Sequence, residues 1–235
     1  MTAIDLRALA PGAAEVTDLA DLASILEPDR HLTTWRRPLD PAVQALASRL
    51  AGDLGRDARA VVRCSEVDLR AEVADLLPES AWRIDPEAAA AWQDDVVELC
   101  EAFAELVQAD ELMISLEGPD EATCPRFHVD RVGIRMLVTY SGPGTEWLAE
   151  CDVDRRFLGE PGQDRPDDQN GVMKRGAVVR SVEPFSVTLL KGEAWPNAEG
   201  FGAVHRSPDP AGAARVLLRV DMLSQLGGGD QEAGR

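Results

Sequence analysis

The chain has 235 residues, and 42 acidic against 24 basic side chains give it a formal net charge of −18 at pH 7. That length suits one large domain or two small ones, and the hydrophobic fraction of 45% and charged fraction of 28% exclude a disordered or fibrous chain. The acidic balance argues against nucleic acid or an anionic membrane as a partner, because both are bound chiefly through Lys and Arg. It does not exclude a local basic pocket for a small anion.

The sequence predicts a cytoplasmic protein. No apolar run approaches the roughly 18 residues that a membrane span needs, and residues 1–6 lack the basic stretch and apolar core of a signal peptide. The four cysteines are widely spaced and form no C-x-x-C pair. We therefore expect neither a zinc-finger-type site nor a disulfide scaffold.

The first half of the chain predicts mainly helices. Residues 1–30 are expected to hold one short helix plus connectors, and residues 31–36 a short strand. Asp40-Pro41 and Asp85-Pro86 each signal the start of a helix, because Asp caps free N–H groups and Pro loses no hydrogen bond at the first position. Another helix is expected over about 66–77. The helix over 86–109 has the clearest signal, since its apolar side chains follow one helical face.

From residue 112 the pattern changes to short strands separated by turns. The predicted strands are 112–116, 127–130, 135–140, 177–182, 186–190, 201–205 and 215–222. Residues 152–176 are polar and aperiodic, which is typical of a lid, a binding loop or a disordered insert. The predicted fold is α+β, with a mainly helical region 1–110 packed on a jelly-roll or cupin-like barrel over 111–223, and a flexible tail at 224–235.

His128-Val129-Asp130 places an imidazole and a carboxylate two residues apart, so both point the same way on a strand. His205 lies on a later predicted strand, which a barrel can bring close. Two His and one carboxylate form the facial triad of non-haem Fe(II) sites, and the same donors suit Zn²⁺. The sequence thus predicts a metal site. In the alternative, the histidines are ordinary barrel residues and Asp130 caps a turn.

The predicted strand at 215–222 alternates between two kinds of side chain. One face holds Arg215, Leu217, Arg219 and Asp221, and the other holds Val216, Leu218, Val220 and Met222. If the helices of the first half cover the apolar face, the arginines line the barrel interior, where a charge needs a partner such as an anionic cosubstrate. Otherwise the arginines lie in solvent.

Other reactive side chains have simpler interpretations. Cys124 could be a nucleophile or a fourth ligand, although a half-buried thiol is more common. Lys191 could reach an anion in a pocket, but a lysine at the end of a strand usually lies in solvent. His31 is interpreted as structural or surface. Three arginines near the His-x-Asp strand could make the mouth of the site basic or pair with surface acids: Arg126, Arg131 and Arg135.

The order of these residues resembles the Fe(II)/2-oxoglutarate-dependent dioxygenase superfamily, whose fold is a double-stranded β-helix. His-x-Asp, a distal His and an Arg ten residues later follow its pattern, and residues 135–147 are similar to its strand and Gly-Thr turn. The resemblance covers about residues 112–222. It implies a hydroxylase-type oxygenase in which Fe(II) is held by His128, Asp130 and His205.

The same resemblance implies 2-oxoglutarate as cosubstrate. Arg215 would hold its distal carboxylate, and Arg219 on the same face is the rival for that role. Tyr140, the only tyrosine, is the hydroxyl that could assist. The segment 152–176 could close over the substrate, which is a small molecule or a protein that the sequence does not name.

Most of the chain also resembles a bacterial family of unknown function. The stretches that carry this resemblance are TWRR at 34–37, YSGPGTEW at 140–147, LKGE at 190–193 and VHRSP at 204–208. Members of that family tend to be encoded near GTPase metallochaperones of zinc homeostasis. The resemblance therefore implies an alternative function, a non-catalytic zinc-binding protein with a metallochaperone partner. A barrel that serves only as an interaction module is the third possibility.

Overall fold

The computed structural model describes residues 7–38, 40–52, 54, 58–64, 69–118, 124–159, 165–196, 198, 200–209, 213 and 215–223. The elements are β1 (Arg7–Ala10), β2 (Ala13–Val16), the 3-10 helix η1 (Ala20–Leu26), β3 (Leu32–Trp35), α1 (Pro41–Leu50), β4 (Ala58–Arg63), α2 (Leu69–Leu76), α3 (Glu79–Ile84), α4 (Pro86–Val107), β5 (Glu111–Glu117), β6 (Ile134–Ser141), β7 (Glu146–Leu148), the 3-10 helix η2 (Arg155–Phe157), β8 (Val179–Ser181), β9 (Val187–Lys191), β10 (His205–Arg206) and β11 (Val216–Leu223).

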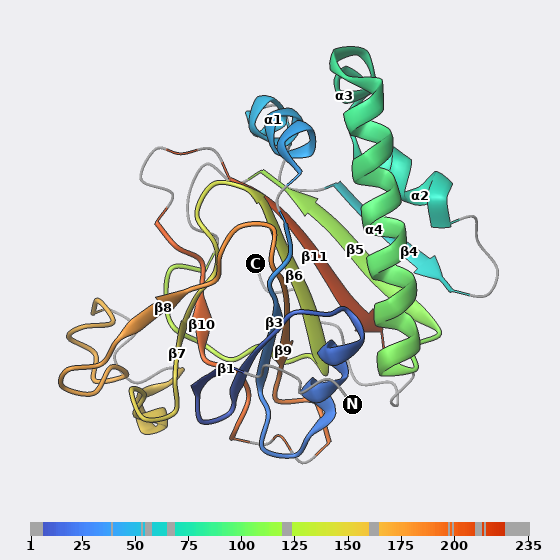
Figure 1. Cartoon of the computed structure of the whole chain (residues 1–235). Coiled ribbons are helices and arrows are strands. Elements are labelled where there is room, and N and C mark those ends of the chain that lie inside the picture. Colours follow the sequence, from blue (N-terminus) through green and yellow to red (C-terminus); the bar gives the residue numbers. More distant parts are fainter. Residues whose placement is uncertain are drawn as a thin grey trace.

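Two β-sheets form the centre of the molecule. The large sheet has eight strands in the order β1-β2-β3-β9-β6-β11-β5-β4, and the small sheet has the order β10-β7-β8. Figure 1 shows the α-helices on one side of the large sheet and the small sheet on the other. The predicted mixture of helices and strands around a β structure is therefore present. Within the described residues, no helix is long and apolar enough to cross a membrane.

The predicted order of helices first and strands afterwards is wrong. Strands β1 to β4 all lie in the first 110 residues, and they form both edges of the large sheet. Residues 7–16 hold two strands where only a short helix and connectors were expected, because their many alanines have low β propensity. Strand β4 and helix α3 were also not predicted.

Other predicted boundaries changed less. The strands predicted at 127–130 and 201–205 reduce to a bridge at His128 and the two-residue strand β10. The helix predicted over 66–77 is α2, and its expected first turn lies outside the described residues. The tail at 224–235 also lies outside them.

Helix α4 shows why the large sheet is covered on one face. Asp85 accepts a hydrogen bond from the N–H of Ala88 at 3.0 Å, and Pro86 occupies the first turn, as the sequence predicts. The buried side of α4 includes Trp92 and Phe103, which belong to one hydrophobic cluster with Leu218 of β11. The helices thus pack on the apolar face of β11.

The opposite face of β11 looks toward the small sheet. Leu217 belongs to a second cluster that contains Trp147 of β7 and Leu137 of β6. Because side chains alternate along a strand, Arg215 and Arg219 share this inner face. The arginines therefore lie between the two sheets, which is the arrangement expected if helices cover the apolar face.

Candidate metal centre

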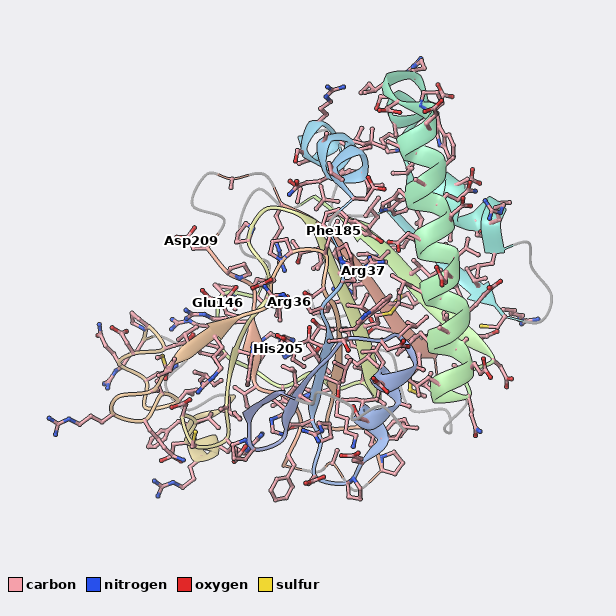
Figure 2. All side chains as sticks on the ribbon, viewed as in Figure 1. Arg36, Arg37, Glu146, Phe185, His205 and Asp209 are labelled. Carbon is pink, nitrogen blue, oxygen red and sulfur yellow. The ribbon has the colours of Figure 1, made fainter. Side chains whose placement is uncertain are left out.

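The two histidines meet across a single β-bridge. The backbone N–H of each donates to the carbonyl of the other, and both N···O distances are 3.0 Å. The ring centroids of His128 and His205 are 4.6 Å apart. Figure 2 shows His205 between the small sheet and the large sheet. The fold therefore brings together two histidines that are far apart in the sequence.

Backbone carbonyls orient both imidazoles. His128 Nδ1 lies 2.8 Å from the carbonyl oxygen of Arg126, and His205 Nδ1 lies 3.0 Å from that of Ala203. A carbonyl oxygen only accepts, so each Nδ1 carries a hydrogen, and in the neutral ring Nε2 keeps its lone pair for a metal. Hydrogen bonding of this kind is how metal-binding histidines are usually oriented.

The Nε2 atoms converge on Asp130. His128 Nε2 lies 3.4 Å from Asp130 Oδ1, and His205 Nε2 lies 3.2 Å from Asp130 Oδ2. Two donors that are each about 2.1 Å from one metal are about 3.0 to 3.4 Å apart at angles between octahedral and tetrahedral. The three ligand atoms lie within 4.8 Å of one another. His128, Asp130 and His205 therefore form a group that could hold a metal ion.

Arg135 supports the carboxylate of this group. Its Nη1 lies 2.7 Å from Asp130 Oδ2, and its Nε and Nη2 donate to the two oxygens of buried Asp221 at 2.6 and 3.0 Å. Burial alone would raise the pKa of Asp130, but the charge of His205, hydrogen bonds from both histidines and Arg135 hold it well below its ordinary value. Asp130 is therefore ionised, as a metal ligand requires.

The pKa of His128 is shifted by the same contacts. Burial alone would lower it, but the hydrogen bonds to Asp130 and to the carbonyl of Arg126 outweigh burial and raise the pKa above its ordinary value. Without an ion, the carboxylate thus attracts a proton to the site. A bound cation would replace that proton, so metal binding would release it.

Arg215 is a buried cation without a carboxylate partner. It is 3% exposed, and its Nη2 donates to Thr145 Oγ1 at 3.1 Å. Its Nε has no hydrogen-bond partner, and among the described residues no carboxylate lies within ion-pair distance of it. Burial lowers its pKa to about 10, which the charge of Glu117 offsets only in part. A buried guanidinium in this state fits an anion.

Arg219, the rival on the same face, already has a partner. Its Nη2 lies 2.7 Å from Glu117 Oε1, and its Nε lies 3.7 Å from Asp221 Oδ2. Its charge is therefore balanced within the protein. Of the two arginines, Arg215 is the one whose charge is left for a ligand.

These groups line one small pocket. It leaves a cavity of about 50 Å³, which is room for a few water molecules. The lining residues are Glu117, Cys124, His128, Arg135, Leu137, Thr145, His205, Arg206, Ser207, Arg215, Leu217 and Arg219. The two predicted histidine ligands and the predicted arginines therefore face the same space.

The structure places Tyr140 outside this pocket, so its predicted role is wrong. Tyr140 is fully buried on the helix-facing side of β6, and its hydroxyl donates to Asp95 Oδ2 at 2.5 Å. Its ring packs against Trp92 and Phe185. The hydroxyl beside Arg215 belongs to Thr145 instead. Leu137 and Tyr140 are both apolar in large part, so alternation along β6 gave no signal of which face each takes.

The remaining candidates lie at the rim of the pocket or outside it. Cys124 is an exposed residue at the rim, but partial burial of its sulfur together with the charge of Asp130 raises its pKa, so the structure gives no activated thiolate. Lys191 is buried and donates to the carbonyl of Glu27 at 2.7 Å. Arg126 donates to the carbonyl of Arg165.

His31 lines a different cavity of about 510 Å³, together with Lys191 and Glu150. Burial, assisted by the charge of Arg155, lowers the pKa of His31 to about 4. His31 is therefore neutral near pH 7, and it does not line the pocket that holds the other two histidines.

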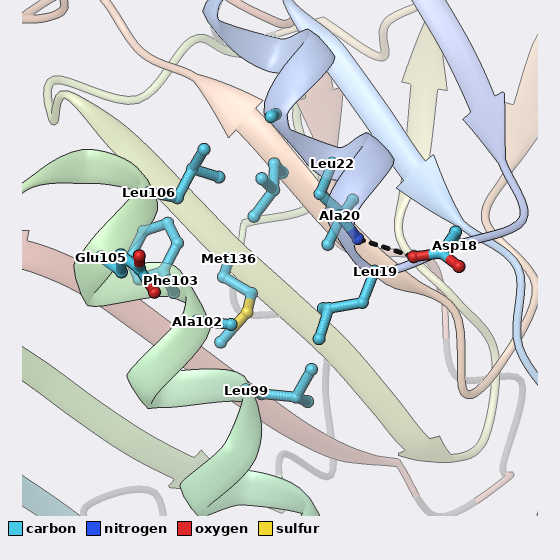
Figure 3. A pocket seen from close by; sticks show the side chains of 12 residues that line it. Asp18, Leu19, Ala20, Leu22, Leu99, Ala102, Phe103, Glu105, Leu106 and Met136 are labelled. Carbon is cyan, nitrogen blue, oxygen red and sulfur yellow. Dashed lines mark hydrogen bonds between the residues drawn. The ribbon is translucent and has the colours of Figure 1, made fainter.

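A wider groove lies on the opposite face of the large sheet. It has a volume of about 600 Å³ and is formed by η1, helix α4 and the strands β6 and β9. Figure 3 shows its mainly apolar side chains, among them Leu99 and Phe103 of α4 and Met136 of β6. Its only ionisable lining residues, within the described part of the chain, are Asp18 and Glu105. The groove lacks the ligand set found between the sheets.

The polar segment 152–176 packs against the small sheet through Val153 and Val172, which share a hydrophobic cluster with Leu148 of β7. Val153 bridges to Met173, and the N–H of Asp154 donates to the carbonyl of Val172 at 2.8 Å. Val153 and Val172 are buried beside Phe127. Two parts of this segment therefore pack beside the residue that precedes His128.

The sequence did not identify several residues that line the pocket or hold its arginines in place. Thr145, Glu117 and Asp221 were not assigned to the site, and Arg135 was expected only at its mouth. The alternation along β11 could have suggested a role for Asp221, because it lies on the same face as Arg215 and Arg219. Strand pairing places Glu117 opposite Leu217 and Arg135 opposite Asp221.

Several solved structures resemble this chain at low identity. A dioxygenase for auxin oxidation from rice is 16% identical, with a TM-score of 0.46 over 88% of this chain and 77% of that one. A prolyl-4-hydroxylase from Pseudomonas putida is 14% identical, with a TM-score of 0.43 over 87% and 98%. A protein from Caulobacter crescentus that is assigned to the 2OG-Fe(II) oxygenase family is 14% identical, with a TM-score of 0.46 over 94% and 87%. Function is therefore inferred from the residues of the site itself.

Sequence comparison identifies the family. No curated protein is similar enough in sequence to count as a relative. One family profile matches residues 16–221, which is most of the chain. The chain belongs to the DUF1826 family, whose members are described as proteins of unknown function.

Proposed function

We propose that the protein is an Fe(II)- and 2-oxoglutarate-dependent oxygenase of the hydroxylase type. The observation that carries this proposal is the buried guanidinium of Arg215, which has no carboxylate partner among the described residues and lines the same pocket as the histidines of the His128–Asp130–His205 group. A metal ligand set and a cation without a counter-ion then occupy one site. The two facing sheets suit the double-stranded β-helix of such enzymes.

Charge balance supports a dianionic cosubstrate. Around the histidines, three guanidinium groups of Arg135, Arg215 and Arg219 face the carboxylates of Asp130, Asp221 and Glu117. Arg206 has carboxylates of its own in Glu146 and Asp167. With both imidazoles neutral, the charges of these three arginines and three carboxylates cancel, so a divalent ion would leave the group with an excess of two positive charges. A dianion such as 2-oxoglutarate restores neutrality, which a dry pocket strongly favours.

The residues take separate roles in this proposal. His128, Asp130 and His205 would hold Fe(II), which supplies the oxygen chemistry when bound. Arg135 fixes the orientation of Asp130, and Arg215 with Thr145 would bind the distal carboxylate of 2-oxoglutarate by charge-assisted hydrogen bonds. The cosubstrate is larger than the present open space, so side chains of the pocket must move when it binds.

An anaerobic titration tests the proposal. Apo-protein receives Fe(II) and then 2-oxoglutarate, and the visible charge-transfer band of the chelate is recorded. We expect a band that is absent in Asp130→Ala and that needs much more 2-oxoglutarate in Arg215→Met. Stoichiometric Fe(II) binding by His205→Ala would remove His205 from the ligand set, and absence of the band in wild-type protein would end the oxygenase proposal.

A zinc-binding function is the second candidate, because the two imidazoles and one carboxylate suit Zn²⁺ as well as Fe²⁺. Zn²⁺ also binds such donors more tightly than Fe²⁺ does. This candidate predicts retention of Zn²⁺ through purification and no response to 2-oxoglutarate. Zinc alone does not explain a buried Arg215 that has no carboxylate partner among the described residues, which is why the oxygenase is preferred.

A further inference from the structure

Asp167 is a buried carboxylate in the polar segment 152–176. Its side chain is only 2% exposed. Its Oδ2 accepts hydrogen bonds from the backbone N–H of Phe127 at 3.1 Å and from Arg206 Nη1 at 2.8 Å. Its Oδ1 accepts from Asn170 Nδ2 at 3.0 Å, which holds the carboxylate within its own turn. Asp167 therefore connects its segment to two other parts of the chain.

Those two parts are the direct neighbours of the histidines. Phe127 precedes His128, Arg206 follows His205, and the two histidines form the β-bridge. The guanidinium carbon of Arg206 lies 4.3 Å from the centroid of the Phe127 ring, so the two residues also contact each other. One carboxylate thus holds both sides of the bridge that sets the separation of the imidazoles.

The packing of the segment acts on the same residues. Val153 and Val172 from the segment are buried in one cluster with Phe127 and with Val204, which lies next to His205. A displacement of the segment would therefore remove apolar contacts and the Asp167 hydrogen bonds together. These contacts reach the neighbours of the histidines rather than the ligand atoms, so their effect must pass through the positions of the histidines.

We propose that Asp167 is a positioning residue that fixes the His128–His205 bridge and so makes metal affinity depend on the packing of segment 152–176. This inference rests on the proposed function, because it takes both histidines as metal ligands. Loss of the carboxylate would leave the buried N–H of Phe127 without its partner and Arg206 with Glu146 alone. Removal of groups that orient metal ligands typically weakens metal binding by about 10- to 100-fold.

The test compares Asp167→Ala with Asp168→Ala, a control in the exposed neighbouring residue. Apo-protein is titrated with Co²⁺, whose visible d–d spectrum reports coordination geometry. Hydrogen exchange of the metal-free proteins is measured for peptides that contain His128 and His205. Asp167→Asn is included because it keeps an acceptor for the Phe127 N–H and the size of the side chain. It should therefore destabilise the fold less than the alanine variant.

We expect Asp167→Ala to bind Co²⁺ about 10-fold or more weakly, with an altered spectrum and faster exchange around both histidines. Asp167→Asn should be intermediate, and Asp168→Ala should match wild-type protein. Unchanged Co²⁺ affinity and spectrum in both Asp167 variants would overturn the inference, even if their melting temperatures fall. If wild-type protein binds no Co²⁺, the proposed function fails, and the exchange data alone then decide whether Asp167 holds the bridge.

Discussion

The two faces of the large sheet each bury an arginine, and they treat it differently. On the helix-facing side, Arg37 binds both oxygens of Asp95 and donates from Nε to the carbonyl of Phe185 at 2.7 Å. On the side that faces the small sheet, Arg215 has Thr145 as its only side-chain partner among the described residues. Both side chains are largely shielded from water, so the difference lies in their partners.

The pKa values express the same contrast. Burial alone would lower the pKa of Arg37, but the hydrogen bond to Asp95 and the neighbouring Tyr140 raise it above its ordinary value. For Arg215, burial prevails and lowers the pKa. A buried arginine is therefore structural when the protein completes its hydrogen bonds, and it indicates a ligand when the protein does not.

The largest expected effect is on the helix-facing side. Asp95→Ala leaves the guanidinium of Arg37 and the hydroxyl of Tyr140 buried without their acceptor, so we expect the free energy of unfolding to fall by about 3 to 5 kcal/mol. Urea denaturation measures it. Asp94→Ala is the matched control, because the Asp94 side chain is 62% exposed and its ion pair with Arg70 lies at the surface. Equal losses in the two variants would contradict the interpretation of Arg37 as a structural arginine.

Arg215 should behave in the opposite way. Arg215→Met removes a buried charge that has only the neutral Thr145 hydroxyl as a side-chain partner among the described residues, so stability should stay level or rise. Affinity for 2-oxoglutarate in the metal-loaded protein should fall about 100-fold, because the distal carboxylate would lose the cation proposed to bind it. Anaerobic isothermal titration gives the affinity. A variant that loses stability but keeps its affinity would reverse the roles assigned to the two arginines.

His31 is a buried base whose titration should make the stability of the protein depend on pH. Its pKa of about 4 in the folded protein lies below its ordinary value of 6.5, so the unfolded chain binds a proton that the folded protein refuses. Stability should therefore be complete above about pH 6.5 and fall by about 2 to 3 kcal/mol as the pH drops toward 4. Chemical denaturation at several pH values in this window measures the free energy of unfolding. In His31→Gln this free energy should change less steeply with pH than in wild-type protein. An unchanged dependence on pH would mean that other groups cause the loss of stability in acid.

The smallest effect is expected at the surface. Arg36 and Glu183 approach to 2.6 Å, about as closely as the buried pairs, but their side chains are 50% and 58% exposed. Water replaces such a contact easily, so Glu183→Ala should cost less than about 1 kcal/mol. A loss as large as that of Asp95→Ala would show that distance, rather than exclusion of water, sets the value of these pairs.

Periodic patterns made part of the fold predictable. The four-three spacing of Trp92, Val96 and Leu99 located helix α4, and the alternation in β11 identified which side of that strand carries arginines. Strands β1 and β2 were missed because they are four residues long, rich in alanine and stabilised by the neighbouring strands rather than by their own propensity. The order of elements along the chain therefore could not be read from local sequence.

The site was predictable to the extent that it follows a motif. His128, Asp130, His205 and Arg215 share a spacing pattern, and the structure brings them together beside one pocket. The partners of these residues follow from tertiary structure. Asp167 is one of 42 acidic residues and lies in a polar segment, and no local signal distinguishes it from exposed Asp168. Tyr140 was misplaced because both faces of β6 are buried.

The bridge between His128 and His205 also bears on the order of folding and metal uptake. The two residues lie in segments separated by β6 to β9, so they meet only when both sheets have formed. In a zinc finger the ligands are close in sequence and the ion drives folding. Here the chain must first fold to bring two distant segments together, and the ion can bind only afterwards. We therefore expect chelators to remove the ion without unfolding the protein. We also expect the ion to bind after folding, by entering through the mouth of the pocket.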